Sequence, residues 1–180
     1  MKKIVYYVAS SLDGFISGEN GDASGFAANG EGVQQYLNDL KEFKTVIMGR
    51  KTYEFGYKYG LKPGAPAYPH MNHYIFSQTL ILDNPESNVN VIRKLDLAEI
   101  EKIKEQSKSD IYLCGGGLFA GWLLENEKID ILKLKINPLI LGRGIKLFGD
   151  SKKNYRLSLI TSNRYEDELV INSYAIKYEK

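Results

Sequence analysis

Cysteine and histidine are scarce in this sequence, which has one cysteine and two histidines in 180 residues. A single cysteine excludes an internal disulfide and fits a reducing compartment, so we expect a cytoplasmic protein. His70 and His73 have no cysteine or carboxylate close to them in the sequence, so we predict no metal site. No apolar run approaches the ~20 residues that span a bilayer, and no signal-peptide cleavage site follows the N-terminal run. We therefore expect no membrane partner.

Neither sign of charge predominates, since 24 basic residues face 22 acidic residues for a net charge of +2. Such a balance predicts no nucleic-acid partner. Two well-known phosphate-binding patterns are also missing. No Gly-x-Gly-x-x-Gly follows the first apolar run, and no Gly-x-x-x-x-Gly-Lys-Ser/Thr occurs, so the sequence has neither a Rossmann fingerprint nor a P-loop.

The hydrophobic content of 43% is enough to bury a core, and the length suits one domain that spans residues 1–180. Residues 3–9, 45–48, 73–77, 89–92 and 111–114 read as strands. Helical patterns at 33–44, 49–54, 95–107 and 118–125 alternate with them. This alternation predicts an α/β fold with three αβα layers and a mostly parallel central sheet.

The last third of the chain has a different pattern. Residues 129–137, 155–165 and 169–178 read as strands, and the last two are separated by a short acidic turn. They predict antiparallel strands at one edge, and hence a mixed sheet. Residues 18–32 form a glycine-rich loop of the kind that acts as a lid. The tyrosine-rich terminal strands would leave an exposed edge, so we also predict a homodimer.

Three clusters follow three of the expected strands directly: residues 49–52, 77–79 and 115–117. They bring glycine amides at helix starts, basic side chains and hydroxyl groups to one edge of the sheet. Each cluster alone is also compatible with an empty turn or an ordinary helix start. Together they match a ligand with a pyrophosphate and a further phosphate. Glycine would let such a ligand lie against the backbone.

The order of these motifs resembles the dihydrofolate reductase fold, and in particular the reductase domain of riboflavin-biosynthesis proteins. The resemblance rests on residues 8–14, 46–54, 111–117 and 139–148, and it covers nearly the whole chain. It implies an NADPH-dependent reductase that transfers a hydride to a C=N or C=O carbon of a small heterocyclic substrate. In that branch the substrate is 5-amino-6-(5-phosphoribosylamino)uracil.

The resemblance also implies roles for individual residues. Ala9 and Ile16 would flank the nicotinamide, and Ser77 would lie near the adenosine 2′-phosphate. Phosphate would be held at a helix start by Gly49, Arg50, Lys51 and Thr52. The pyrophosphate and the nicotinamide side would be bracketed by Gly115, Gly116, Gly117, Leu118 and Phe119.

Two acidic residues are candidates for proton transfer to the substrate. Asp13 lies in a Ser-Leu-Asp-Gly turn, where it could equally close the turn through its own backbone. Glu31 lies where dihydrofolate reductases keep a carboxylate, but a solvated surface role is an equal alternative. Two other functions therefore stay open: a catalytically idle nucleotide-binding protein with the same fold, and a true dihydrofolate reductase.

Overall fold

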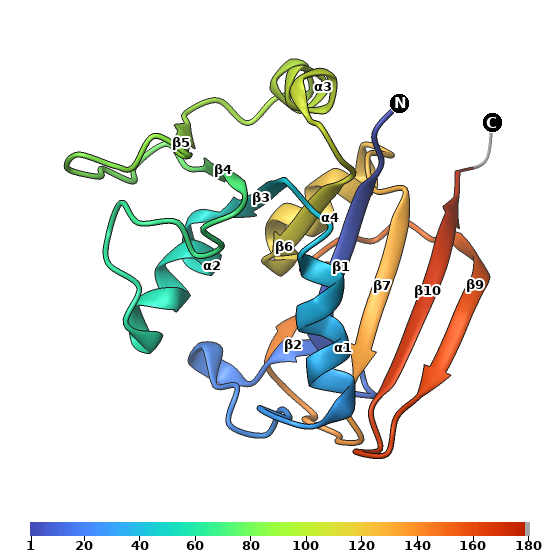
Figure 1. The fold of residues 1–180 in the computed structure, drawn as a ribbon. Helices are drawn as coiled ribbons and strands as arrows, with labels where there is room; N and C mark the ends of the chain where they lie inside the picture. The colour runs from blue at the N-terminus through green and yellow to red at the C-terminus, as the bar shows by residue number, and fades with distance from the viewer. Residues whose placement is uncertain (179–180) are drawn as a thin grey trace.

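The computed structural model describes residues 1–178, and one large sheet runs through it (Figure 1). The strands are β1 (Ile4–Ser10), β2 (Phe15–Ser17), β3 (Thr45–Gly49), β4 (Asn72–Phe76), β5 (Val89–Ile92), β6 (Ile111–Gly115), β7 (Ile131–Ile136), β8 (Ile145–Lys146), β9 (Arg156–Arg164) and β10 (Val170–Lys177). The helices are α1 (Glu31–Leu40), α2 (Arg50–Phe55), α3 (Leu97–Gln106) and α4 (Gly117–Glu125), with 3-10 turns η1 (Glu19–Gly21) and η2 (Gly56–Tyr59).

The large sheet has eight strands in the order β5-β4-β3-β6-β1-β7-β10-β9. Strands β5 to β7 are parallel to one another, whereas β10 is antiparallel to β7 and β9 is antiparallel to β10. The predicted mixed, mostly parallel sheet with antiparallel C-terminal strands is therefore confirmed.

The central strands are apolar on both faces because helices cover both faces. On β1, Ile4 and Tyr6 belong to one buried cluster, and Val5 and Tyr7 belong to the other. The first cluster also takes side chains from α3 and α4, and the second takes side chains from α1 and α2. This arrangement gives the three predicted layers. No helix within residues 1–178 is both long and apolar enough to cross a membrane.

The observed starts of α3 and α1 can be compared with the predicted ones. Helix α3 begins after Asp96, whose carboxylate accepts from the amide of Glu99 at 2.9 Å, as the N-cap pattern predicts. Helix α1 begins at Glu31, two residues before the predicted start. The reason lies far along the chain, because Asp167 in the β9–β10 turn accepts from the amide of Gly32 at 2.9 Å.

The irregular segment before β9 contains a strand that the sequence analysis missed. Strand β8 pairs antiparallel with β2 and forms a separate two-stranded sheet. This small sheet ties the segment around residues 145–146 to the glycine-rich loop that follows β2. The predicted C-terminal hairpin forms, with β9 and β10 each one residue shorter at both ends than expected.

Candidate active site

The carboxyl ends of the parallel strands share one edge of the sheet, and the predicted ligand clusters gather there. Gly49 is the last residue of β3, Gly115 is the last residue of β6, and Ser77 follows β4. These three strands are adjacent in the order β4-β3-β6. The three clusters therefore lie in a row.

The first and third clusters touch each other. A Cβ built on Gly116 would lie 3.1 Å from the hydroxyl oxygen of Thr52, in the first turn of α2. Gly115 has a φ of +130°, a conformation that glycine adopts without strain, and the peptide bond between Gly115 and Gly116 is cis. Neither α2 nor α4 has a side-chain cap, so no capping side chain takes the amides of their first turns.

The fold itself requires glycine at position 117, apart from any ligand. A Cβ on Gly117 would lie 2.1 Å from the carbonyl oxygen of Lys146, and one on Gly121 would lie 2.3 Å from that of Phe148. Helix α4 therefore packs backbone to backbone against residues 146–148. The close contact with Lys146 therefore requires glycine at position 117 whether or not a ligand lies there.

Ser77 and Arg50 belong to one network at this edge. The hydroxyl oxygen of Ser77 accepts from the amides of Thr79 and Leu80, at 3.2 and 2.9 Å. The Arg50 guanidinium donates to the Thr79 hydroxyl and pairs with Glu54, both at 2.8 Å. Ser77 and Arg50, which we predicted to bind phosphate, thus already form hydrogen bonds within the protein. The neighbouring Lys51 is exposed.

A pocket of about 250 Å³ opens between these elements. Its lining includes Gly49, Ser77, Arg93, Leu95, Leu118 and Phe119. Leu95 and Leu118 are 44% and 67% exposed, so the walls present apolar surface to solvent. Arg93 donates to the carbonyl oxygens of Ser77 and Gln78, at 3.5 and 3.3 Å. The pocket combines an apolar slot with a guanidinium at its polar end.

Ala9 lies half-buried at the end of β1, and Ile16 is the central residue of β2. The predicted lid that follows Ile16 is attached at several points. Its Ala27 amide donates to the side-chain oxygen of Asn137 at 2.9 Å, and Glu19 in η1 lies 3.4 Å from the Arg143 guanidinium. In this conformation the loop rests on the segment that connects β7 to β8.

Both predicted acids accept hydrogen bonds from backbone amides. The Asp13 carboxylate accepts from the amides of Leu141 and Gly142, at 3.1 and 2.7 Å. Hydrogen bonding by the Ser11 hydroxyl, and then by these amides, lowers the pKa of Asp13 to about 2. The exposed Glu31 accepts from the amide of Glu166 at 3.2 Å. The alternative role of Asp13 in local structure therefore has a concrete form, with one partner, Ser11, in its own turn and two partners, Leu141 and Gly142, far along the chain.

Residues 2–171 match the RibD C-terminal domain. This chain belongs to that family. Its relatives include the uncharacterized protein YwjB of Bacillus subtilis strain 168, which is 29% identical over 160 residues that cover 88% of this chain and 89% of YwjB.

Two solved structures show the same fold as this RibD C-terminal domain protein. A proposed riboflavin biosynthesis protein from Shewanella sp. PV-4 superposes with a TM-score of 0.79 and 22% identity, over 99% of this chain and 100% of the other. A dihydrofolate reductase from Enterococcus faecalis, in complex with NADP(H), superposes with a TM-score of 0.66 and 14% identity, over 98% and 97%. The resemblance to the dihydrofolate reductase fold and to the riboflavin branch is confirmed. The family is one of reductase domains.

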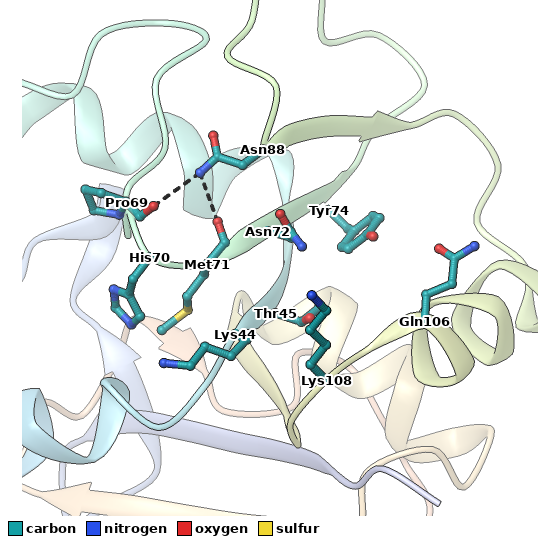
Figure 2. Close-up of a pocket in the computed structure, with 10 residues that line it drawn as sticks. All are labelled: Lys44, Thr45, Pro69, His70, Met71, Asn72, Tyr74, Asn88, Gln106 and Lys108. Carbon is teal, nitrogen blue, oxygen red and sulfur yellow. Dashed lines mark hydrogen bonds between the residues drawn. The ribbon is translucent and has the colours of Figure 1, made fainter.

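A second pocket, of about 360 Å³, lies at the amino ends of β3 and β4, away from the predicted ligand clusters (Figure 2). Two of its basic side chains contact the C-terminus of α1. The Lys44 ammonium donates to the carbonyl of Lys41 at 3.0 Å. The His70 ring lies 3.1 Å from the carbonyl of Leu40. Basic side chains near a helix C-terminus often bond its free carbonyl groups, so these two contacts have a role in the fold of the RibD-type domain.

The histidines make no metal centre in the described part of the chain, where no three groups that bind metals come together. His73 is fully buried, accepts from the amide of Tyr68 at 3.1 Å, and has a pKa lowered to about 4, chiefly by burial. It is a neutral core residue.

The residues that follow β5 on this edge of the RibD-type fold were not predicted from the sequence. Arg93 and Leu95 come directly after β5, just as Ser77 comes after β4. The rule that ligands meet the carboxyl ends of parallel strands would have included them, had it been applied to the fourth strand of the row. Lys135, a buried lysine on β7, was not predicted from the sequence either.

Proposed function

We propose that this protein is an NADPH-dependent reductase that transfers a hydride to a C=N or C=O carbon of a small heterocyclic substrate. The proposal rests on one observation above all: the clusters at Ser77, Gly49 and Gly115 follow three adjacent strands in a row that ends beside Ala9 on β1. An extended dinucleotide needs such a row, with an adenosine end, two phosphates and a nicotinamide end.

The pocket between α4 and β5 suits the adenosine end. Leu95 and Leu118 offer flat apolar surface to an adenine ring, and the Arg93 guanidinium offers charge-assisted hydrogen bonds to a 2′-phosphate. The uncapped first turns of α2 and α4 would receive the pyrophosphate on their amides. The nicotinamide would then lie against Ala9 and Ile16, under the loop that follows β2.

The first substrate to test is 5-amino-6-(5-phosphoribosylamino)uracil, because the chain belongs to the RibD C-terminal domain family. Dihydrofolate is less well supported, since the carboxylates of Asp13 and Glu31 are engaged by backbone amides. When bound, NADPH would supply the hydride. The protein would position the two molecules and exclude water between them. We expect it to act in the cytoplasm.

Titration with NADPH and with NADH, followed by nicotinamide fluorescence and melting temperature, tests the cofactor. Arg93→Ala should weaken NADPH binding about ten-fold to a hundred-fold, the worth of a lost charge-assisted hydrogen bond, and leave NADH binding unchanged. Arg156→Ala, on the edge strand β9, removes the same charge far from the pocket and should change neither affinity.

Three outcomes separate the candidate functions. If saturating NADPH neither binds nor raises the melting temperature, the reductase proposal fails. If NADPH binds and is oxidised with the aminouracil but not with dihydrofolate, the riboflavin-type activity is supported. If NADPH binds without turnover of any aminopyrimidine, pterin or quinonoid compound, the protein is an idle nucleotide-binding member of the family.

A further inference from the structure

Lys135 is a buried cation that nothing in the described structure neutralises directly. Its side chain is on β7 and the residue is 5% exposed. Its ammonium lies 5.3 Å from the centre of the Tyr36 ring on α1. Within residues 1–178 this ammonium forms neither an ion pair nor a hydrogen bond, and it is not among the fully enclosed side-chain atoms that lack a partner, so its tip keeps some contact with solvent. Lysine is almost never buried without a partner, because removing its charge from water is costly.

Lys133, two residues earlier on the same face of β7, provides an internal comparison. Its ammonium lies 2.6 Å from the Asp39 carboxylate and 4.5 Å from the centre of the Tyr7 ring. Asp39 also accepts from the hydroxyl of Tyr7 at 2.9 Å. The same strand therefore holds one lysine that is fully paired and one that is not.

The charged and titratable groups around Lys135 do not replace a partner. Asp167 attracts its ammonium from the β9–β10 turn, but the carboxylate oxygens of Asp167 accept from the amides of Gly32 and Leu169. Tyr36 is a neutral phenol whose pKa is raised by burial, and Lys133 carries a like charge that Asp39 compensates. Burial lowers the pKa of Lys135, and the attraction to Asp167 opposes this only in part.

The position of Lys135 in the sheet places it next to the proposed cofactor site. Lys135 is the β-sheet partner of Ala9, at the carboxyl end of β1. Strands β4 and β1 are three strand spacings apart, about 14 Å. A cofactor that runs from Ser77 to Ala9 would cover that distance and end beside β1. Strand β7 is the next strand in the row, so Lys135 would lie one strand beyond a nicotinamide placed against Ala9.

We propose that the Lys135 ammonium binds the substrate at its reducible double bond and is the proton donor of the reaction. This inference rests on the proposed reductase function. The hydride of NADPH would add to the carbon of the C=N or C=O bond, and the electron pair of that bond would move to the nitrogen or oxygen. That atom takes the proton of Lys135, which leaves NADP⁺, the reduced product and a neutral amine that water reprotonates. The substrate class is a heterocycle whose reducible bond offers an unprotonated acceptor atom.

Lys135→Met, Lys135→Arg and the control Lys133→Met test this role. We expect Lys135→Met to bind NADPH within about two-fold of the wild type and to reduce the aminouracil, or whichever pterin or quinonoid compound the wild type reduces, at least ~100-fold more slowly, the usual contribution of a general acid. Lys135→Arg should restore substrate affinity but not the rate, because a guanidinium does not release its proton. Lys133→Met should stay within a few-fold of the wild type.

Two further readouts distinguish a proton donor from a structural lysine. The wild-type kcat/KM should fall as the pH rises through the pKa of Lys135, and this decline should be absent from Lys135→Met. The melting temperature of Lys135→Met should equal or exceed that of the wild type, since an unpaired buried charge has been removed. A clear loss of stability would show a structural role and overturn the proposal.

The failures of the two proposals differ. If the wild type does not bind NADPH, the reductase function itself is wrong. If the wild type binds NADPH but its NADP⁺ complex binds none of these ring compounds in a thermal-shift assay, the substrate class assigned through Lys135 is wrong. Wild-type turnover by Lys135→Met overturns the proton-donor role and leaves the reductase function standing.

Discussion

Asp13 joins two distant loops through a single carboxylate. It follows β1, and the amides that it accepts from belong to Leu141 and Gly142, more than a hundred residues further along the chain. A carboxylate held by several donors stays ionised to low pH, and its pKa of about 2 lies below the ordinary value of 3.8. These hydrogen bonds join the turn at the end of β1 to residues 141–142, which is a structural contribution of the Asp13 carboxylate.

The depressed pKa of Asp13 predicts how stability depends on pH. Because the folded pKa is below the unfolded pKa, the contribution of Asp13 is fully present above about pH 4 and is lost as the pH falls towards 2. Asp13→Asn should therefore be less stable than the wild type at pH 6, and the difference should shrink between pH 4 and pH 2. Denaturant unfolding of both proteins across this range measures it. A difference that stays constant with pH would contradict the assignment.

The limits of sequence reasoning at this scale follow from chain distance. Asp13 and Glu31 stand out as acids near a glycine turn, and the strand-then-glycine pattern is enough to place Gly49 and Gly115 at one edge. Apart from Ser11, the groups that donate to the two carboxylates come from residues 141–142 and 166, and no local sequence pattern predicts them. The burial of Lys135 could not be predicted either, because a lysine on a strand with one polar face normally points to solvent.

Helix α4 is positioned by close backbone contact, since Gly117 and Gly121 both face the carbonyls of residues 146–148. The two glycines are four residues apart and so lie on one side of the helix. Gly49 differs, because a Cβ there would meet only the Cβ of Phe119 at 3.7 Å, an ordinary contact, and its φ is −82°. One glycine is required by the fold, whereas the other leaves room that the protein alone does not use.

This difference predicts opposite effects for two alanine substitutions. Gly117→Ala should lower the free energy of unfolding by about 3 kcal/mol, the upper end of typical overpacking, since a backbone carbonyl cannot move aside easily. Gly49→Ala should change stability by less than about 0.5 kcal/mol and should weaken NADPH binding at least ten-fold, because the new methyl group occupies the space of the ligand. Chemical denaturation and nicotinamide fluorescence measure the two quantities. Gly49→Ala with wild-type affinity would show that the cofactor does not pass over Gly49.

Elements with strong periodic patterns were predicted within one or two residues, as with β3, β5 and α3. Strand β8 was missed because two residues carry no period of their own and exist as a strand only through pairing with β2. The early start of α1 was missed because its capping carboxylate, Asp167, comes from the C-terminal hairpin. In both cases a tertiary contact determines a local boundary.

Across the whole molecule, the sheet ends differently at its two sides. At one side β5 is a short strand of four residues. At the other side β9 is nine residues long, and nearly all of its residues are exposed. Leu157, Leu159 and Ile160 on this strand are 45%, 60% and 53% exposed. A long edge strand that presents apolar side chains and unpaired backbone groups favours association with another chain.

We therefore expect a homodimer whose interface includes β9. Sedimentation of the wild type at micromolar concentration should give a dimer. Leu159→Lys places a charge on the edge strand opposite Tyr174. This variant should be a monomer whose far-ultraviolet circular dichroism spectrum matches that of the wild type. Ile81→Lys introduces the same charge at a side chain that is 79% exposed between β4 and β5, at the other side of the sheet, and should leave the dimer intact. A wild type that sediments as a monomer, or a Leu159→Lys variant that stays dimeric, would exclude β9 as the interface.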